Sequence, residues 1–348
     1  MKRTGFLILL LGCLNLLLGQ NNPRVAAGLM QGNGPAGFPV TGSVDRLDPA
    51  MDRIVARGVL PEVLAEGFTW TEGPLWLPDQ EMLVFSDIPN NSIFSWSEQG
   101  GLKRYLKPSG YTDTLPRGGE TGSNGLLLDA EGRLVLCQHG DRRMAVMDAP
   151  LEHPAPEYLT LADRWQGKRF NSPNDAVFSK SGMLYFTDPA YGLEFRYEDP
   201  KRELDFTGVF MLSADGKVTL LTDSLSAPNG IGLSPDQTRL YVSNSGGNSG
   251  FVWLEYGLDD SGLPVSGHLF SDGNAARDSL KGAPDGLVIR RDGMIFATGP
   301  GGVWVFQPDG KHLGIIRTGQ ATSNCTLDTE EQYLYMTADD YLMRIRLR

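Results

Sequence analysis

Carboxyl and amide side chains recur along this 348-residue chain, each one just ahead of a short aliphatic stretch. This first set consists of Glu72, Asn124, Asn174, Asn229, Asp285 and Asn324. A second set lies 14 or 15 residues later, where a following apolar stretch ends: Asp87, His139, Asp188, Asn244, Gly299 and Ala338. Oxygen ligands suit a hard divalent cation, Ca²⁺ ahead of Mg²⁺, with Mn²⁺ and Zn²⁺ as alternatives. If the fold gathers the first set, its two carboxylates would balance one such cation and leave coordination positions open for substrate.

A simpler explanation exists for each of these residues taken alone. Asn or Asp before Gly commonly makes a turn, and a repeated position can serve folding only. Six oxygen-bearing side chains at one place exceed what turns require, so we interpret the set as a site.

The elements that position these residues form a repeat. The copies of the first set are 52, 50, 55, 56 and 39 residues apart, whereas the spacing inside each copy stays at 14 or 15 residues. Constant inner spacing with variable outer spacing indicates a constant β-hairpin that carries variable loops. A third apolar stretch follows each hairpin, and a fourth follows in all copies but the last.

Six four-stranded units predict an all-β fold, a six-bladed β-propeller. The last unit lacks a fourth strand, and residues 61–66 form a spare strand before the first unit. We therefore predict that this N-terminal strand pairs with residues 342–347 and closes the ring, which removes free sheet edges. A two-domain β protein is the structural alternative. In a propeller the first strand of each blade lines the central channel, so both sets should surround one mouth of that channel.

Composition and charge restrict the function further. The chain is 41% hydrophobic and 21% charged, as in ordinary globular proteins, and its net charge is −11. The sequence has no basic run, so we expect no nucleic-acid partner. Cys137 and Cys325 are too few for a disulfide framework or a structural zinc site, and we interpret them as small buried residues. The oligomeric state leaves no signal in the sequence.

The N-terminal residues 1–20 have the pattern of an export signal. Lys2 and Arg3 precede a nearly apolar run over residues 5–18, too short to predict a transmembrane domain. We therefore expect an exported protein, periplasmic or secreted. Residues 10–13 also resemble a bacterial lipobox, which offers a lipid anchor on Cys13 as an alternative. We interpret residues 21–60 as a linker and residues 61–348 as the propeller domain.

Five motifs occur in order along the predicted blades: Thr71–Pro74, Asn171–Asp175, Tyr185–Gly192, Ala227–Gly230 and Ala283–Gly286. They resemble the SMP-30/gluconolactonase/luciferin-regenerating-enzyme family over roughly residues 60–345. The resemblance implies a six-bladed propeller with one divalent metal in the channel, and usually lactone hydrolysis.

The same resemblance implies roles for individual residues. Glu72, Asn229 and Asp285 match the family's metal ligands, and Asn174 lies beside metal and substrate. Asp285 matches the residue that is given the acid/base role. Some relatives hold a sugar acid with an arginine just before the motif of Asn174. Here Ser172 and Pro173 occupy that stretch and Arg169 lies farther upstream, so the sequence predicts a small lactone or sugar-derived substrate without naming it.

The leading hypothesis is therefore a metal-dependent lactonase in which the cation polarises the carbonyl and Asp285 moves a proton. We expect Asn174, Asp188 and His139 to contact substrate or to support those that do. One alternative is a quinone-dependent sugar dehydrogenase, which would need basic and histidine side chains at the mouth. The other is a non-catalytic, strictosidine-synthase-like binding propeller. A serine or cysteine hydrolase is less favoured, because the sequence lacks GxSxG.

Overall fold

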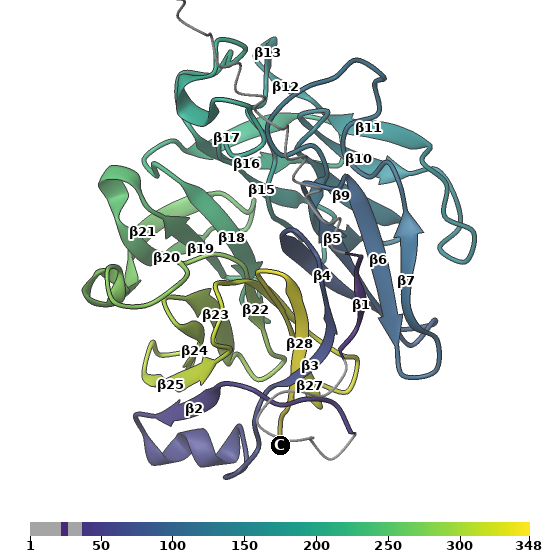
Figure 1. Cartoon of the computed structure of the whole chain (residues 1–348). Coiled ribbons are helices and arrows are strands. Elements are labelled where there is room, and N and C mark those ends of the chain that lie inside the picture. Colours follow the sequence, from purple (N-terminus) through teal and green to yellow (C-terminus); the bar gives the residue numbers. More distant parts are fainter. Residues whose placement is uncertain (1–21, 27–36) are drawn as a thin grey trace, which may run out of the picture.

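The computed structural model describes residues 22–26 and 37–348. The predicted export signal and Cys13 lie outside these residues. The fold is a six-bladed β-propeller, as predicted, with its sheets arranged around a central channel (Figure 1). Among the described residues, no helix is long and apolar enough to cross a membrane.

Each blade is an antiparallel sheet whose strands follow one another along the chain. Blade one contains β4 (Thr71–Leu77), β5 (Met82–Asp87), β6 (Ser92–Ser97) and β7 (Gly101–Leu106). Blade two contains β8 (Ser123–Leu128), β9 (Leu134–Gln138), β10 (Arg143–Met147) and β11 (Tyr158–Ala162). Blade three contains β14 (Ala176–Phe178), β15 (Leu184–Asp188), β16 (Gly208–Leu212) and β17 (Val218–Thr222). Blade four contains β18 (Pro228–Leu233), β19 (Arg239–Ser245), β20 (Phe251–Leu258) and β21 (Pro264–Asp272).

The last two blades each carry a strand from the N-terminal part of the chain. Blade five contains β22 (Leu287–Ile289), β23 (Ile295–Gly299), β24 (Gly302–Phe306), β25 (His312–Arg317) and, outermost, β2 (Ser43–Arg46). Blade six contains β26 (Thr322–Leu327), β27 (Tyr333–Ala338), β28 (Tyr341–Arg346), β3 (Glu62–Glu66) and β1 (Arg24–Val25). A separate hairpin joins β12 (Arg164–Trp165) to β13 (Lys168–Arg169). The short 3₁₀ helices are η1 (Pro49–Arg53), η2 (Arg196–Glu198), η3 (Gly247–Ser249) and η4 (Asn274–Ala276).

The predicted closure of the ring is confirmed. β3 pairs antiparallel with β28, and the paired residues include Glu62 with Arg344. Arg344 is fully buried, and its Nε donates to Glu62 Oε2 at 2.9 Å while its guanidinium also binds Glu98 and lies over the Tyr333 ring. An ion pair inside the closing seam ties the two ends of the domain together.

The stretch from Ser43 to residue 59, which we predicted as part of a linker, packs on blade five instead. β2 pairs with β25 over four residues, from Ser43 with Arg317 to Arg46 with Gly314. Met51 and Val55 are fully buried in the core between blades five and six. This stretch is therefore an extra strand and turn of the propeller. Apolar residues three or four apart, such as Leu47, Met51 and Val55, are compatible with a short helix here, but the strand partner β25 is distant in the sequence, which is why the sequence did not reveal this packing.

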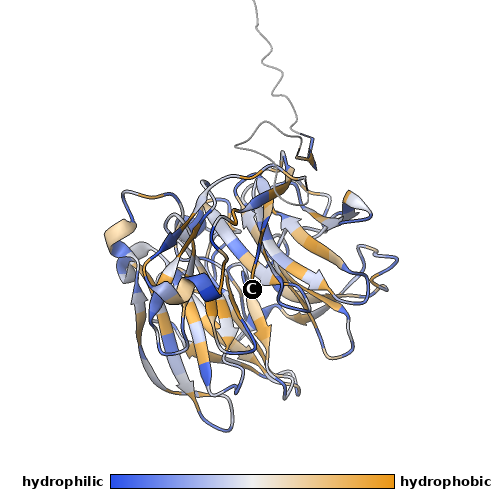
Figure 2. Cartoon of the chain, turned by 90° about the horizontal axis from the view of Figure 1, so that it is seen from below, coloured by the Kyte–Doolittle hydropathy of each residue, from blue (hydrophilic) through white to orange (hydrophobic). Residues whose placement is uncertain are grey.

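The core consists of apolar layers between neighbouring blades. Val84 and Ile93 of blade one, for example, pack with Leu134 and Leu136 of blade two. Hydrophobic residues are concentrated on the strands, while the connecting loops are mostly hydrophilic (Figure 2). Cys137 and Cys325 are buried free thiols in this core, as predicted.

Candidate metal centre and active site

The first strand of every blade is irregular where it reaches the channel mouth. The register of β4 with β5 shifts between Glu72 and Leu75, and equivalent shifts occur at the starts of β8, β18 and β26. In blades three and five the regular strand begins two residues after Asn174 and Asp285. Bulges of this kind re-aim a side chain. All six residues of the first set lie at such irregularities.

Main-chain contacts join the six positions into a ring. Gly125 N donates to Asn174 O at 2.8 Å, and Gly286 N donates to Ser323 O at 2.7 Å. Side-chain hydroxyl groups make the other links: Ser86 to Asn124 O, Thr187 to Asn229 O, Ser243 to Asp285 O and Ser323 to Thr71 O. The structure therefore gathers the first set at one channel mouth, as the sequence predicts. We call these six residues the ring.

The glycines that follow several ring residues allow the blades to approach closely. A Cβ at Gly230 would lie 2.2 Å from Asp285 O, and a Cβ at Gly286 would overlap the side chain of Asn324. Neither glycine has a positive φ. Their role is thus close blade contact rather than the tight turn that Asn-Gly or Asp-Gly could have indicated.

Blade three has Asp175 where blades one, two, four and five have that glycine and blade six has Cys325, and the Asp175 carboxyl group is buried in the channel. Burial raises its pKa to about 7, although the Ala176 N–H, which donates to Asp175 Oδ1 at 2.9 Å, opposes the shift. Next to the ring, Asp175 and Asn324 border a cavity of about 220 Å³ with Ile231 and Leu287 among its walls. Sequence reasoning missed Asp175, although its break in the glycine pattern was a usable signal.

Several ring oxygens are buried without any hydrogen-bond partner. They are Asn124 Oδ1, Asn174 Oδ1 and Asp285 Oδ1. Leaving a buried acceptor unsatisfied typically costs about 1–3 kcal/mol, so such groups call for an explanation. A cluster of three such oxygens on one ring indicates a binding place for a ligand that these oxygens can coordinate or hydrogen-bond.

The ring also holds two carboxyl groups, and no basic side chain of the described residues contributes to their pKa shifts. Burial raises the pKa of Asp285 well above its ordinary value, and the charges of Glu72, Asp175 and Glu120 raise it further. Burial likewise raises the pKa of Glu72, and Asp175 and Glu120 contribute, while the Gly73 N–H opposes the shift. Burial and the neighbouring carboxyl groups thus disfavour ionisation at the ring.

The residues present fit a hard divalent cation. Among the described residues, no three His, Cys, Asp or Glu side chains form a metal cluster. A cation at the ring would therefore combine the two carboxylates with asparagine oxygens, and an oxygen-only donor set of this type suits Ca²⁺ or Mg²⁺.

The amide of Asn229 is oriented from outside the ring. Its Nδ2 donates to Ser245 Oγ at 2.9 Å, and the Ser245 hydroxyl donates to Pro284 O at 2.6 Å. Since the Ser245 proton is directed to Pro284, its oxygen must accept from Asn229.

His139 lies beside Asn174 and is fully buried. Its Nε2 is 3.5 Å from Asn174 Nδ2, and its Nδ1 is 3.0 Å from Glu120 Oε2. Sequence reasoning placed His139 near the site but missed Glu120, which lies in the loop between blades one and two, where no repeat position marks it.

Three other residues of the second set, Asp188, Asp87 and Asn244, hold the backbone that leads into their own blade. Asp188, which we predicted to contact substrate or support such a contact, accepts the N–H groups of Asn171 at 2.8 Å and Ser172 at 2.7 Å. Burial raises its pKa to about 7. Asp87 accepts the N–H groups of Thr69 and Trp70, and Asn244 accepts that of Ala227, in the same way. The structure thus gives Asp188 a supporting role, fixing the segment that leads into Asn174.

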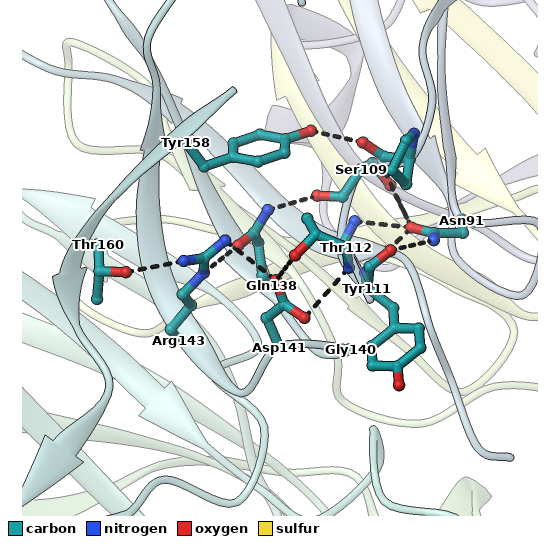
Figure 3. A network of polar contacts seen from close by, with 12 residues as sticks. Asn91, Ser109, Tyr111, Thr112, Gln138, Gly140, Asp141, Arg143, Tyr158 and Thr160 are labelled. Carbon is teal, nitrogen blue, oxygen red and sulfur yellow. Dashed lines mark hydrogen bonds and ion pairs between the residues drawn. The ribbon is translucent and has the colours of Figure 1, made fainter. Parts of the chain in front are cut away.

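The loop over residues 107–122 is anchored by hydrogen bonds at two places along its length. Near its start, Asn91 Oδ1 accepts N–H groups from Ser109, Gly110 and Tyr111, and the network continues through Gln138, Asp141 and Arg143 (Figure 3). Farther along, Arg117 donates to the carbonyl groups of Gly118, Gly140 and Gly192. This loop therefore holds Glu120 against the segments that carry His139 and Tyr191.

The structure also shows the contacts of Tyr191 and Arg169, which the sequence alone did not reveal. Tyr191 is close enough to Asp285 for that carboxylate to raise its pKa, after the larger effect of burial. Arg169 donates to Asp141 O at 2.6 Å and so supports the loop region.

Comparison with known proteins places this site in context. A family model described as SMP-30/Gluconolactonase/LRE-like region matches residues 70–340. A gluconolactonase from Zymomonas mobilis subsp. mobilis is 40% identical over 313 residues, which cover 88% of this chain and 86% of that protein. A pentonolactonase from Haloferax volcanii is 26% identical over 76% of this chain and 80% of its own length. The solved structure of a gluconolactonase from Xanthomonas campestris has a TM-score of 0.75 and 30% identity, and covers 89% of this chain and 97% of its own.

Proposed function

Because the chain belongs to the SMP-30/gluconolactonase/LRE-like family, we propose that it is a lactonase that opens its substrate at the ring with the help of one divalent cation. The observation that carries this proposal is the cluster of unpartnered buried oxygens beside two carboxyl groups whose ionisation burial disfavours.

Glu72, Asn174, Asn229 and Asp285 would hold the cation, and Asn124 offers a further oxygen. Four or five protein oxygens leave part of a Ca²⁺ shell of six to eight open. A cation bound there would polarise the lactone carbonyl and offset the negative charge that develops on its oxygen. Ca²⁺ is our first assignment, with Mg²⁺, Mn²⁺ and Zn²⁺ as alternatives to be compared directly.

Asp285 is the residue we assign to proton transfer. It is a carboxyl group with one unpartnered oxygen at the channel mouth, whereas Glu120 faces His139 and Asp175 lies in the channel and accepts from Ala176. Asp285 would accept a proton from the attacking water and return it to the endocyclic oxygen of the lactone, which is the leaving group. Asn174 would help to orient the substrate at the same place.

The substrate class follows from the relatives and from the loops around the mouth. The named relatives act on gluconolactone or a pentonolactone, so we propose a small sugar-derived lactone. The loop over residues 107–122 and the segment that contains η2 border the mouth and would select among such lactones.

The other hypotheses find less support. A quinone cofactor with acidic groups would meet Glu72, Asp285, Asp175 and Glu120, which disfavour further negative charge. A binding propeller without catalysis gives no reason for Asp285 to keep an unpartnered buried oxygen. Export, with a periplasmic or secreted destination, stays a proposal from the sequence, and fractionation of cells that express the full chain tests it.

The experiment that separates these hypotheses is a panel of sugar lactones, measured with and without EDTA and corrected for spontaneous hydrolysis. We expect hydrolysis that EDTA abolishes and added Ca²⁺ restores. Turnover that needs a quinone and an electron acceptor would favour the dehydrogenase, and no turnover with any lactone would favour the binding propeller.

A further inference from the structure

An asparagine amide can present either its oxygen or its nitrogen to a neighbour, but only the oxygen can ligate a cation. In the ring this choice matters, because an amide N–H that faced Glu72 or Asp285 would hydrogen-bond their carboxylates and compete with the cation. At Asn229, Nδ2 donates to Ser245 Oγ and the amide also hydrogen-bonds Asp285, whereas at Asn324 the oxygen accepts from Cys325 N.

We infer that Glu120 and His139 form a hydrogen-bond relay that holds the amide of Asn174 with its oxygen toward the channel. The inference rests on the proposed function, since it concerns how a cation ligand is presented. In this relay Glu120 and His139 are positioning residues that act through Asn174.

The contacts define the direction of each hydrogen bond. A carboxylate can only accept a hydrogen bond, so in this relay the donor to Glu120 Oε2 is the imidazole Nδ1, 3.0 Å away. Nε2 then carries a lone pair, and the group facing it at 3.5 Å is Asn174 Nδ2, which can donate. With its nitrogen held by His139, Asn174 directs Oδ1 the other way, and Oδ1 is buried without a partner.

The surroundings keep the imidazole in this orientation. The backbone of Gly192 lies against His139 so closely that a Cβ there would be 2.8 Å from His139 Cβ. Arg117 binds the carbonyl groups of both Gly140, which follows His139, and Gly192. The imidazole is fully buried, while the Glu120 side chain remains 28% exposed.

Two substitutions at His139 separate the relay from simple packing. In His139→Asn the shorter amide can still donate to Glu120 but places no acceptor near Asn174. In His139→Gln the longer side chain places an acceptor oxygen near the former Nε2. Neither variant removes a proposed cation ligand.

The measurement is calorimetric titration of the cation-stripped full chain with Ca²⁺. We expect His139→Asn to weaken Ca²⁺ binding by about 10–100-fold, the usual effect of losing a residue that orients a ligand, and His139→Gln to stay within roughly threefold of wild type. His268→Asn, at an exposed histidine, serves as the matched control. Thermal unfolding without cation checks that each variant is folded.

The outcomes distinguish this inference from the proposed function. If the wild type binds Ca²⁺ and His139→Asn binds it equally well, or if both His139 variants lose affinity equally, the relay is refuted while the cation site stands. If the wild type binds no divalent cation, the proposed function fails, and the relay is judged by ¹⁵N NMR of the imidazoles. There the relay requires a proton on Nδ1 and none on Nε2 of His139, with the signals identified by their loss in His139→Gln; a proton on Nε2 would overturn it.

Discussion

Replacing Asp285 with asparagine separates its two proposed roles. The change is nearly isosteric, and the backbone is held from both sides, since Asp285 N donates to Thr298 O and Asp285 O accepts from Ser243. We therefore expect the Asn variant to fold and to keep an oxygen at the ring. Cation binding should weaken, because a full negative charge is lost.

The size of the kinetic effect follows from what remains at the site. A general acid–base step contributes on the order of 10²–10⁴ in rate, or about 3–5 kcal/mol of barrier. The other carboxyl groups described near the ring already have partners, since Glu72 accepts from Gly73 N, Glu120 faces His139 and Asp175 accepts from Ala176. We expect turnover at saturating Ca²⁺ to fall over this full range rather than by a few fold.

The assay is lactone hydrolysis at several Ca²⁺ concentrations, with occupancy measured on the same samples. Asp87→Asn is the control, because that buried carboxyl group accepts from backbone N–H groups and lies outside the ring. If saturating Ca²⁺ restores wild-type turnover to Asp285→Asn, Asp285 is a ligand only and the proton acceptor lies elsewhere. If neither binding nor turnover changes, the ring is not the site.

Three further predictions follow from the same structure. Glu72→Gln removes a charge from the ring, so calorimetry should show weaker Ca²⁺ binding, and unchanged affinity would argue against Glu72 as a ligand. The pKa of Glu72 is raised to about 8, mainly by burial, and that of Asp285 is raised as well. Between the unfolded and folded pKa values the folded state holds more protons, so the thermal stability of the cation-free protein should fall as pH rises from about 4 to 8. Ca²⁺ affinity should increase over the upper part of that window, because the cation binds the ionised carboxylates. A flat profile of stability or of affinity would contradict these expectations. Glu62→Ala leaves the buried Arg344 with Glu98 as its remaining carboxylate partner. Urea unfolding should then show a free energy of unfolding lower by about 3–5 kcal/mol, or by less if Glu98 compensates. An unchanged free energy would mean that the ion pair does not stabilise the closure.

The blade architecture was predictable because each hairpin repeats the same polar and apolar positions at constant spacing. The same repeat exposed a missing strand at one end and a spare one at the other, and β3 with β28 confirms the match. The packing of β2 and η1 was not predictable, since β2 is a short edge strand whose partner is distant in the sequence.

The ring was predictable for a related reason: its residues occupy a repeat position, and a channel needs residues at that position in every blade. Glu120 was not predictable, because it belongs to a loop without periodicity and acquires its partner only through tertiary structure. Asp188 shows the opposite case, in which a repeat position carries a polar side chain that binds backbone N–H groups. A repeated polar residue can thus support the fold beside one that contacts a ligand, and only geometry distinguishes them.

The most direct test of the cation-dependent lactonase is one titration in which two quantities are followed together. The cation-stripped protein is titrated with Ca²⁺ while calorimetry reports occupancy and parallel samples report the rate of sugar-lactone hydrolysis. We predict one site per chain and a hydrolysis rate that starts near the spontaneous rate and rises in proportion to occupancy. A full rate at zero occupancy, or a rate that stays unchanged while the site fills, would contradict the account.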